Sequence, residues 1–101
     1  VYTASKHALD SLTKNTGYMY AKKNIRCNAI CPGSIETDIG SGEYMYHVNQ
    51  DGMNTIMDNI GGNSRSGSPA EVAEIAVFLA SDESSLINCQ CLAADAGSTA
   101  C

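Results

Sequence analysis

The chain has 101 residues, of which 44% are hydrophobic, and a net charge of -5 with only six Lys and Arg residues. This length allows one domain or a part of one, and the apolar fraction is ordinary for a globular protein. The acidic balance argues against nucleic acid or an anionic membrane surface as a partner. No apolar run approaches the roughly 20 residues that span a bilayer. We therefore expect a cytoplasmic protein without a membrane or nucleic-acid partner.

The first predicted element is a helix over residues 3–23. Its larger side chains recur at a spacing of three to four residues, which predicts one largely apolar stripe. The stripe consists of Leu9, Leu12, Thr16 and Met19. Gly17 weakens the helix by up to about 1 kcal/mol, but it would allow another helix to approach. Asn24, after two lysines, suits a left-handed helix end.

Tyr2 and Lys6 open this helix, one turn apart on the same face. A phenol beside an ammonium is a proton-transfer pair, because the positive charge favours the phenolate and lowers a tyrosine pKa that is otherwise near 10. A general acid or base works best when its pKa is close to the working pH. The lysine can also donate hydrogen bonds to hydroxyls of a ligand. The same spacing is common in solvated surface pairs, so the pair alone does not define a site.

Residues 25–30 form a short, largely apolar run that Pro32 and Gly33 close. Such a run between helices predicts a parallel strand buried on both faces, in a protein of the α/β class. The loop over 34–42 then lies at the carboxyl end of the strand, where open α/β sheets bind ligands. Residues 39–62 predict a substrate loop or lid with one or two short helices; ordinary helices that cover a core edge are the alternative.

The last third of the chain begins with a flexible loop over 61–67. Ser68, Pro69 and Glu71 form a capping box with Pro at the first helical position. The helix that follows is predicted to end near Ser81. Its predicted buried stripe consists of Val72, Ile75, Ala76 and Leu79. A final strand is predicted over 89–94.

The five cysteines predict free thiols, because their number is odd and the composition resembles that of a cytosolic protein. Their Cys-x-x-x-Cys and Cys-x-Cys spacings do not match zinc sites, so no metal site is predicted. Cys101 is the one most prone to oxidation. A thiol or metal protein remains the alternative.

Two motifs, in this order and at this separation, resemble the short-chain dehydrogenase/reductase family. They are Tyr2-Thr3-Ala4-Ser5-Lys6 and Asn28-Ala29-Ile30-Cys31-Pro32-Gly33-Ser34-Ile35-Glu36-Thr37. The tail resembles the family's last helix and strand, in Ser68-Pro69-Ala70-Glu71-Val72-Ala73 and Cys91-Leu92-Ala93-Ala94-Asp95. The resemblance covers residues 1–101 and implies an α/β fold: the C-terminal part of a single Rossmann-type, doubly wound parallel sheet, ordered helix, strand, lid helices, helix, strand. The family's glycine-rich cofactor turn and catalytic Ser have no counterpart here, and we expect them upstream of Val1.

The resemblance also implies a function, namely hydride transfer between NAD or NADP and a small alcohol, ketone or aldehyde. Tyr2 would be the general acid/base, and Lys6 would contact the nicotinamide ribose and lower the Tyr2 pKa. The cofactor-binding residues that the resemblance implies are Tyr2, Lys6, Pro32, Gly33, Ile35 and Thr37. The full-length enzyme would be a homo-oligomer, either a tetramer or a dimer. The fragment alone is expected to be inactive, and a non-catalytic interaction or oligomerisation fragment is the rival interpretation.

Several further positions bear on these expectations. Cys89 stands where the family usually has Gly, and Ala96 stands where its usual Asp-Gly-Gly has the first Gly. Asp38 is predicted to be a loop or capping residue, and His47 is a candidate for the lid. For Arg65, an ion pair with a carboxylate ranks above contact with a substrate anion.

Overall fold

The computed structural model describes residues 1–37, 49–52, 54 and 65–99. Its helices and strands are α1 (Tyr2–Met19), β1 (Ala29–Pro32), α3 (Pro69–Ala80) and β2 (Cys91–Ala94), with 3-10 turns at Ala21–Lys23 and Asp82–Ser84. Of the predicted lid at 39–62, only 49–52 and 54 are described. Asp38 and His47 lie outside the described residues.

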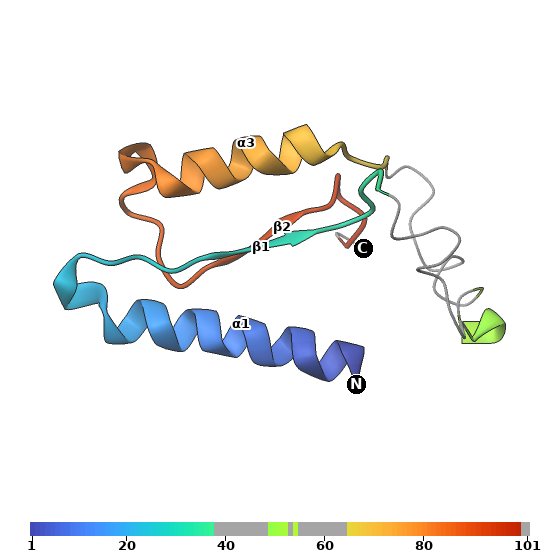
Figure 1. Cartoon of the computed structure of the whole chain (residues 1–101), viewed down its shortest axis with the longest axis horizontal. Coiled ribbons are helices and arrows are strands. Elements are labelled where there is room, and N and C mark those ends of the chain that lie inside the picture. The colour runs from blue at the N-terminus through green and yellow to red at the C-terminus, as the bar shows by residue number, and fades with distance from the viewer. Residues whose placement is uncertain (38–48, 53, 55–64, 100–101) are drawn as a thin grey trace.

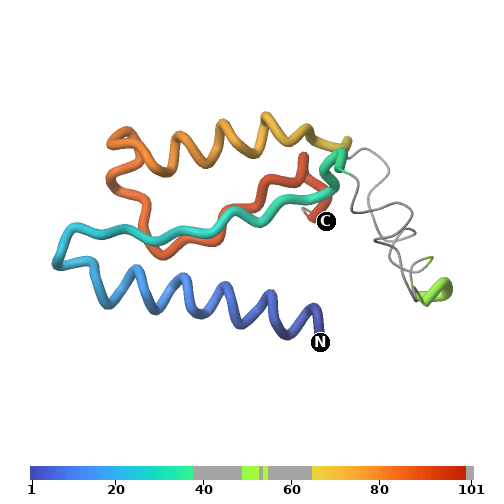
Figure 2. Tube along the Cα trace, in the orientation of Figure 1, coloured from blue at the N-terminus to red at the C-terminus, as the bar shows by residue number. Residues whose placement is uncertain are grey.

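The two strands form a parallel sheet between two helices, with α1 on one face and α3 on the other (Figure 1). The register pairs Ala29 with Cys91 and Pro32 with Ala94. The tube in Figure 2 shows α1 running in one direction and the chain returning as β1. The carboxyl ends of both strands therefore share an edge with the N-termini of both helices. This arrangement confirms the predicted α/β, Rossmann-type class.

Both strands begin later than predicted, β1 at Ala29 rather than 25 and β2 at Cys91 rather than 89. In the preceding segments, side-chain hydrogen bonds add to two backbone bonds, from the Cys89 N–H to the Cys27 carbonyl at 3.0 Å and from the Ala29 N–H to the Gln90 carbonyl at 2.8 Å. The Asn88 carboxamide oxygen accepts the Cys27 backbone N–H at 2.9 Å, and the Asn28 carboxamide oxygen accepts the Gln90 N–H at 3.0 Å. The apolar pattern could not predict this, because it does not record which polar side chains bond across the segments.

Arg26 is the centre of a polar network that the sequence did not predict. Its guanidinium donates to four oxygens at 3.0 to 3.1 Å: the Ser84 hydroxyl and the carbonyls of Leu79, Ser81 and Ile87. Two of these carbonyls lie at the C-terminal end of α3, where backbone oxygens lack helical partners and attract cations. The Arg26 side chain therefore joins the approach to β1 to the end of α3 and to the segment before β2.

The packed face of α1 differs from the predicted apolar stripe. Thr13 is only 6% exposed and Gly17 is buried, whereas Leu9, Leu12 and Met19 are 51 to 63% exposed. A Cβ at Gly17 would lie 2.6 Å from the Asn88 carboxamide oxygen and 3.2 Å from the Cys27 carbonyl oxygen. Small and polar residues thus let the strand-entry segments approach α1, rather than another helix. Among the described residues, no apolar side chain is fully buried.

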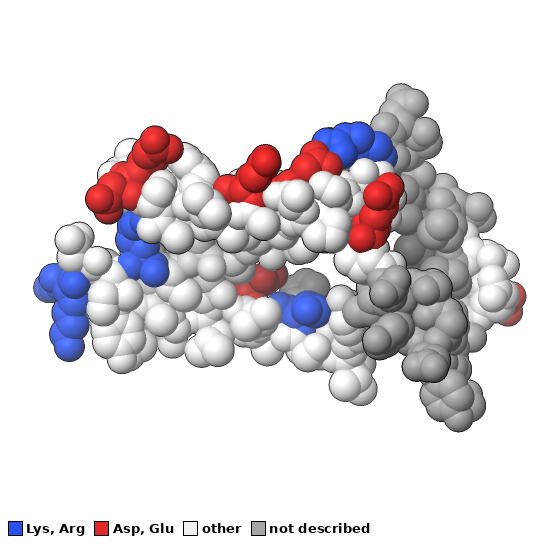
Figure 3. Space-filling view, turned by 45° about the horizontal axis from the view of Figure 1, so that its top comes forward, with Lys and Arg blue, Asp and Glu red and all other residues white. Residues whose placement is uncertain are grey.

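The capping box of α3 is confirmed: the Ser68 hydroxyl accepts the Glu71 N–H, and the Glu71 carboxylate accepts the Ser68 N–H. The helix ends at Ala80 with Ser81 as its cap, as predicted. Three residues of its predicted stripe are half-buried, namely Val72, Ile75 and Leu79, whereas Ala76 is exposed. Acidic side chains gather along α3 and the turn after it (Figure 3), consistent with the negative net charge.

Within the described residues, three that are not glycine adopt a left-handed backbone conformation: Asn24 (φ 63°), Cys89 (φ 61°) and Ala96 (φ 52°). The prediction for Asn24 is confirmed. Cys89 and Ala96 are the two positions where the resemblance leads one to expect Gly. At both positions the backbone therefore has the left-handed conformation that glycine adopts readily, although Cys89 and Ala96 carry a side chain.

The part of the chain that the structure describes contains no helix that is both long and apolar enough to cross a membrane.

We expect Arg26→Lys to lower the free energy of unfolding by about 2 kcal/mol, because an ammonium lacks the planar fork that reaches four oxygens and would leave half-buried carbonyls unsatisfied. Urea unfolding of the protein measures this change. Lys22→Ala, which removes an exposed cation from the 3-10 turn after α1, is the control and should change stability by no more than about 0.5 kcal/mol. Equal unfolding midpoints for the Arg26 variant and the wild type would contradict the prediction.

Ala96→Gly should raise stability by about 0.5 to 1 kcal/mol, because relief of the left-handed strain exceeds the added entropy of the unfolded chain. The opposite sign is expected for Ala8→Gly in exposed α1, a loss of about 1 kcal/mol. Thermal or urea unfolding of both variants tests the pair, and a destabilised Ala96 variant would show that its turn carries no strain.

Candidate active site

A cavity of about 400 Å³ lies at the edge where α1 begins and β1 ends. We call it the Tyr2 cavity. It is lined by Tyr2, Lys6, Leu9, Asp10, Ala29, Ile30, Cys31, Pro32, Gly33, Ile35 and Thr37. All six residues that the sequence analysis selected therefore line one cavity, although two come from the first turns of α1 and four from a segment about 30 residues later.

Tyr2 and Lys6 face each other on the first turns of α1. The Lys6 Nζ lies 5.4 Å from the centroid of the Tyr2 ring, which is within the range of a cation–π contact. The Tyr2 side chain is 74% exposed, so a ligand can reach its hydroxyl. The Ser5 hydroxyl donates to the Tyr2 carbonyl at 2.7 Å, and His7 donates to the Thr3 carbonyl at 2.9 Å. These two side chains therefore bond to the helix backbone, and neither lines the cavity.

The opposite wall of the cavity is the segment 33–37, which continues beyond β1. Ile35 forms an isolated parallel bridge with Gly67. The Gly67 N–H donates to the Ser34 carbonyl at 2.8 Å, and the Glu36 N–H donates to the Gly67 carbonyl at 2.9 Å. Because backbone groups alternate between the two edges of an extended segment, the N–H and C=O of Ile35 itself point away from Gly67. These two groups are free of the bridge and suited to a ligand amide.

Gly33 is packed against the turn after β2. The sequence suggested that its missing side chain lets a ligand approach. A Cβ at this position would instead lie 2.7 Å from the Cβ of Asp95 and 2.9 Å from its Cα. Gly33 lines the Tyr2 cavity, but the space that a side chain would fill belongs to the turn after β2. Its N–H donates to the Ala94 carbonyl at 3.1 Å, so Gly33 serves the packing between the two strand ends.

Five residues of the cavity lining were not among the predicted site residues, and two of them, Asp10 and Cys31, have side chains that can ionise. The Cys31 thiol donates to Asp10 Oδ1 at 3.9 Å. Burial raises the pKa of the neighbouring Cys91 thiol, and a hydrogen bond with Asp10 raises it further. The signal for Asp10 was present, because it follows Lys6 by one helical turn, just as Lys6 follows Tyr2. Cys27, Cys31, Cys89 and Cys91 are free, and the described residues hold no group of three or more potential metal ligands.

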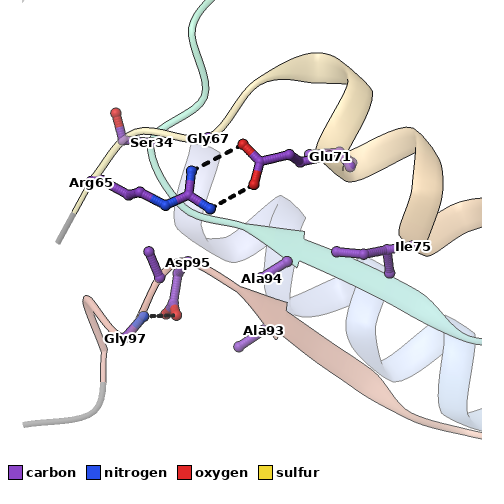
Figure 4. Close-up of a pocket in the computed structure, with 11 residues that line it drawn as sticks. Ser34, Arg65, Gly67, Glu71, Ile75, Ala93, Ala94, Asp95 and Gly97 are labelled. Atoms are coloured by element: carbon purple, nitrogen blue, oxygen red, sulfur yellow. Dashed lines mark hydrogen bonds and ion pairs between the residues drawn. The ribbon is translucent and has the colours of Figure 1, made fainter.

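A second cavity, of about 310 Å³, lies on the other side of segment 33–37 and includes Ser34, Gly67 and Asp95 in its lining. Arg65 and Glu71 form a two-pronged ion pair there, with N···O distances of 2.9 and 2.6 Å (Figure 4). This confirms the prediction that Arg65 pairs with a carboxylate. The bonds from Arg65 and the Ser68 N–H lower the pKa of Glu71 to about 2.

The fold and the cavity together define a class of protein. Parallel strands whose carboxyl ends meet helix N-termini form the ligand-binding edge of Rossmann-type α/β proteins, and the Tyr2 cavity lies at that edge.

The comparison with known proteins gives the family within this class. Residues 1–99 match the family model described as Enoyl-(Acyl carrier protein) reductase. The chain is 48% identical over 96 residues to 3beta-hydroxysteroid dehydrogenase 2 of Eggerthella lenta, covering 95% of this chain and 36% of that protein. It is 36% identical over 99 residues to 2,5-dichloro-2,5-cyclohexadiene-1,4-diol dehydrogenase of Sphingobium indicum, covering 98% and 38%. The chain belongs to the short-chain dehydrogenase/reductase family.

Solved structures agree with this assignment. A 4-hydroxyisoleucine dehydrogenase complexed with NADH superposes with a TM-score of 0.76 at 35% identity, covering 99% of this chain and 40% of that one. A short chain dehydrogenase from Mycobacterium paratuberculosis bound to NAD superposes with a TM-score of 0.81 at 28% identity, covering 99% and 38%. The chain thus spans a little over a third of the length of its curated relatives.

The ion pair between Arg65 and Glu71 predicts a pH dependence. Glu71 has its pKa lowered from 4.5 to about 2 in the folded chain, so its contribution to stability is complete above pH 4.5 and is lost as the pH falls toward 2. The difference in unfolding free energy between wild type and Glu71→Gln should therefore shrink across this interval. Unfolding at a series of pH values measures it. A difference that stays constant down to pH 2 would show that the carboxylate is not paired.

Proposed function

We propose that this chain is the C-terminal part of a NAD(P)-dependent oxidoreductase that interconverts an alcohol with a ketone or aldehyde. The observation that carries the proposal is the convergence of Tyr2, Lys6 and the 33–37 segment on one cavity. The two superposed structures, one complexed with NADH and the other bound to NAD, support a nicotinamide cofactor. The named dehydrogenases among the relatives support a small-molecule substrate.

The residues present fit the nicotinamide end of such a cofactor. A volume of about 400 Å³ lies within the usual range of about 300 to 1,000 Å³ for small-molecule sites. Lys6 offers an ammonium that donates to ribose hydroxyls, and the Thr37 hydroxyl can both donate to and accept from a carboxamide. The N–H and C=O of Ile35, which the bridge to Gly67 leaves free, can bond to the same carboxamide. A nicotinamide dinucleotide, when bound, supplies or accepts the hydride.

The proton chemistry belongs to Tyr2. In reduction, its hydroxyl gives a proton to the substrate oxygen; in oxidation, its phenolate takes the proton of the alcohol. Lys6 supports both directions by position, because its ammonium lies 5.4 Å from the ring centroid and makes a cation–π contact that orients the phenol. Pro32 ends β1, and Gly33 follows it into the segment that lines the cavity.

The rival proposal, an interaction or oligomerisation fragment without catalysis, is favoured by a different observation. Large apolar side chains are exposed on α1 and on α3: Leu9, Leu12 and Met19 on α1, and Val77 and Phe78 on α3. Apolar surface of this extent is typical of contact sites. In the full-length enzyme, the same faces would serve a homodimer or homotetramer, so oligomerisation and catalysis are compatible.

In the full-length protein, Tyr2→Phe should lower kcat by about 10²- to 10⁴-fold, the usual contribution of a general acid or base. Cofactor affinity should stay largely unchanged, because the aromatic ring remains. Steady-state kinetics and a fluorescence titration with NADH measure the two quantities.

Tyr18→Phe is the matched control, since Tyr18 lies on the same helix but is 82% exposed and does not line the Tyr2 cavity. This variant should retain wild-type turnover. The isolated 101-residue chain should show no turnover of NAD(P)H. Preserved activity in Tyr2→Phe would remove Tyr2 from the chemistry, and robust turnover by the isolated chain would show that no further residues are needed.

A further inference from the structure

The segment that lines the Tyr2 cavity is fastened to the segment that leads into α3. The bridge between Ile35 and Gly67 contributes two backbone hydrogen bonds. A third link joins the hydroxyls of Ser34 and Ser66, whose oxygens are 2.9 Å apart. The position of Ile35 against the cavity is therefore tied to the position of Gly67.

The segment around Gly67 is in turn fixed by an ion pair between Arg65, which precedes Gly67, and Glu71, which follows it. The Arg65 guanidinium donates to both carboxylate oxygens of Glu71 and to the Ser66 carbonyl at 3.3 Å. The same Glu71 carboxylate accepts the Ser68 N–H at 3.1 Å. The ion pair thus closes around Gly67 and binds its neighbours to the first turn of α3. We call this pair the Arg65–Glu71 clasp.

The clasp and the Tyr2 cavity lie on opposite sides of segment 33–37. Ser34 and Gly67 line the second cavity, while Gly33, Ile35 and Thr37 line the Tyr2 cavity. The fit between the two paired segments is close, because a Cβ on Gly67 would lie 3.1 Å from the Ile35 Cδ1. A shift of Gly67 away from α3 would therefore displace the wall that faces Tyr2 and Lys6.

We propose that Arg65 and Glu71 are positioning residues for the nicotinamide amide, acting through Gly67 on the backbone of Ile35 and on Thr37. This inference rests on the proposed function and extends it beyond the residues that line the Tyr2 cavity. Neither Arg65 nor Glu71 lines that cavity, so their effect on cofactor binding is indirect. Without the clasp, the competent arrangement of segment 34–37 is less populated, and the apparent affinity falls in proportion.

The helix cap has to be separated from the clasp in the experiment, because Glu71 takes part in both. Glu71→Gln does this, since Gln retains a carbonyl oxygen that completes a capping box but carries no charge for Arg65. Arg65→Ala removes the other partner and leaves the cap intact. Glu74→Gln is the matched control, as it neutralises an exposed carboxylate one turn further along α3.

In the full-length protein, Arg65→Ala and Glu71→Gln should each weaken NADH binding by about fivefold, the effect of losing one well-formed ion pair. Amide hydrogen exchange should accelerate at the N–H groups of Glu36 and Gly67, and not within α1. The double variant should be no worse than either single variant, because both remove the same interaction. kcat at saturating NADH should change by less than about twofold, because the effect lies in binding rather than in the proton transfer.

Unchanged NADH affinity and unchanged exchange in both single variants would overturn the inference while leaving the proposed function intact. An equal effect of Glu74→Gln would also overturn it, since general charge rather than the clasp would then be responsible. Absence of NADH binding by the wild-type protein would overturn the proposed function, and the inference with it. Additive losses in the double variant would show that the two residues act separately and would contradict the clasp.

Discussion

The Arg26 guanidinium is the interaction on which the geometry of this chain depends. It holds the last carbonyls of α3, the buried Ser84 hydroxyl and the Ile87 carbonyl at one point beside the approach to β1. An arginine can do this because its five N–H donors lie in one rigid plane. The start of β1, the end of α3 and the chain entering β2 thereby share one anchor, which helps to fix the parallel register.

The importance of this anchor follows from the weakness of apolar packing in the described residues. Thr13, Gly17 and Ser84 are the only buried residues among those described, and none of them is a large apolar residue. The Asn28 and Asn88 side chains, each donating one hydrogen bond and accepting at least one, therefore reinforce the few backbone bonds at the strand entries. The exposed apolar faces of the helices are consistent with a chain that spans little more than a third of its relatives.

The candidate site lies at the opposite edge of the sheet, where segment 33–37 lies between two cavities. Segment 33–37 separates the Tyr2 cavity from the cavity beside Arg65, so residues on its two sides influence one another through the backbone. The Tyr2–Lys6 pair lies on one side and the Arg65–Glu71 clasp on the other. The first is the proposed proton-transfer pair, and the second is the proposed positioning pair.

The sequence by itself determined the features that depend on neighbours within one or two helical turns. These are the capping box of α3, the left-handed Asn24, the approach of Lys6 to Tyr2, and the order of elements that predicts the Rossmann-type fold. The tertiary structure alone decided the late strand starts, the packed side of α1, the contact of Gly33 with Asp95, and the partners of Arg26. The Arg26 bonds join residues 53 to 61 positions apart. Local periodicity contains no record of such pairs, because they form only when folding brings the segments together.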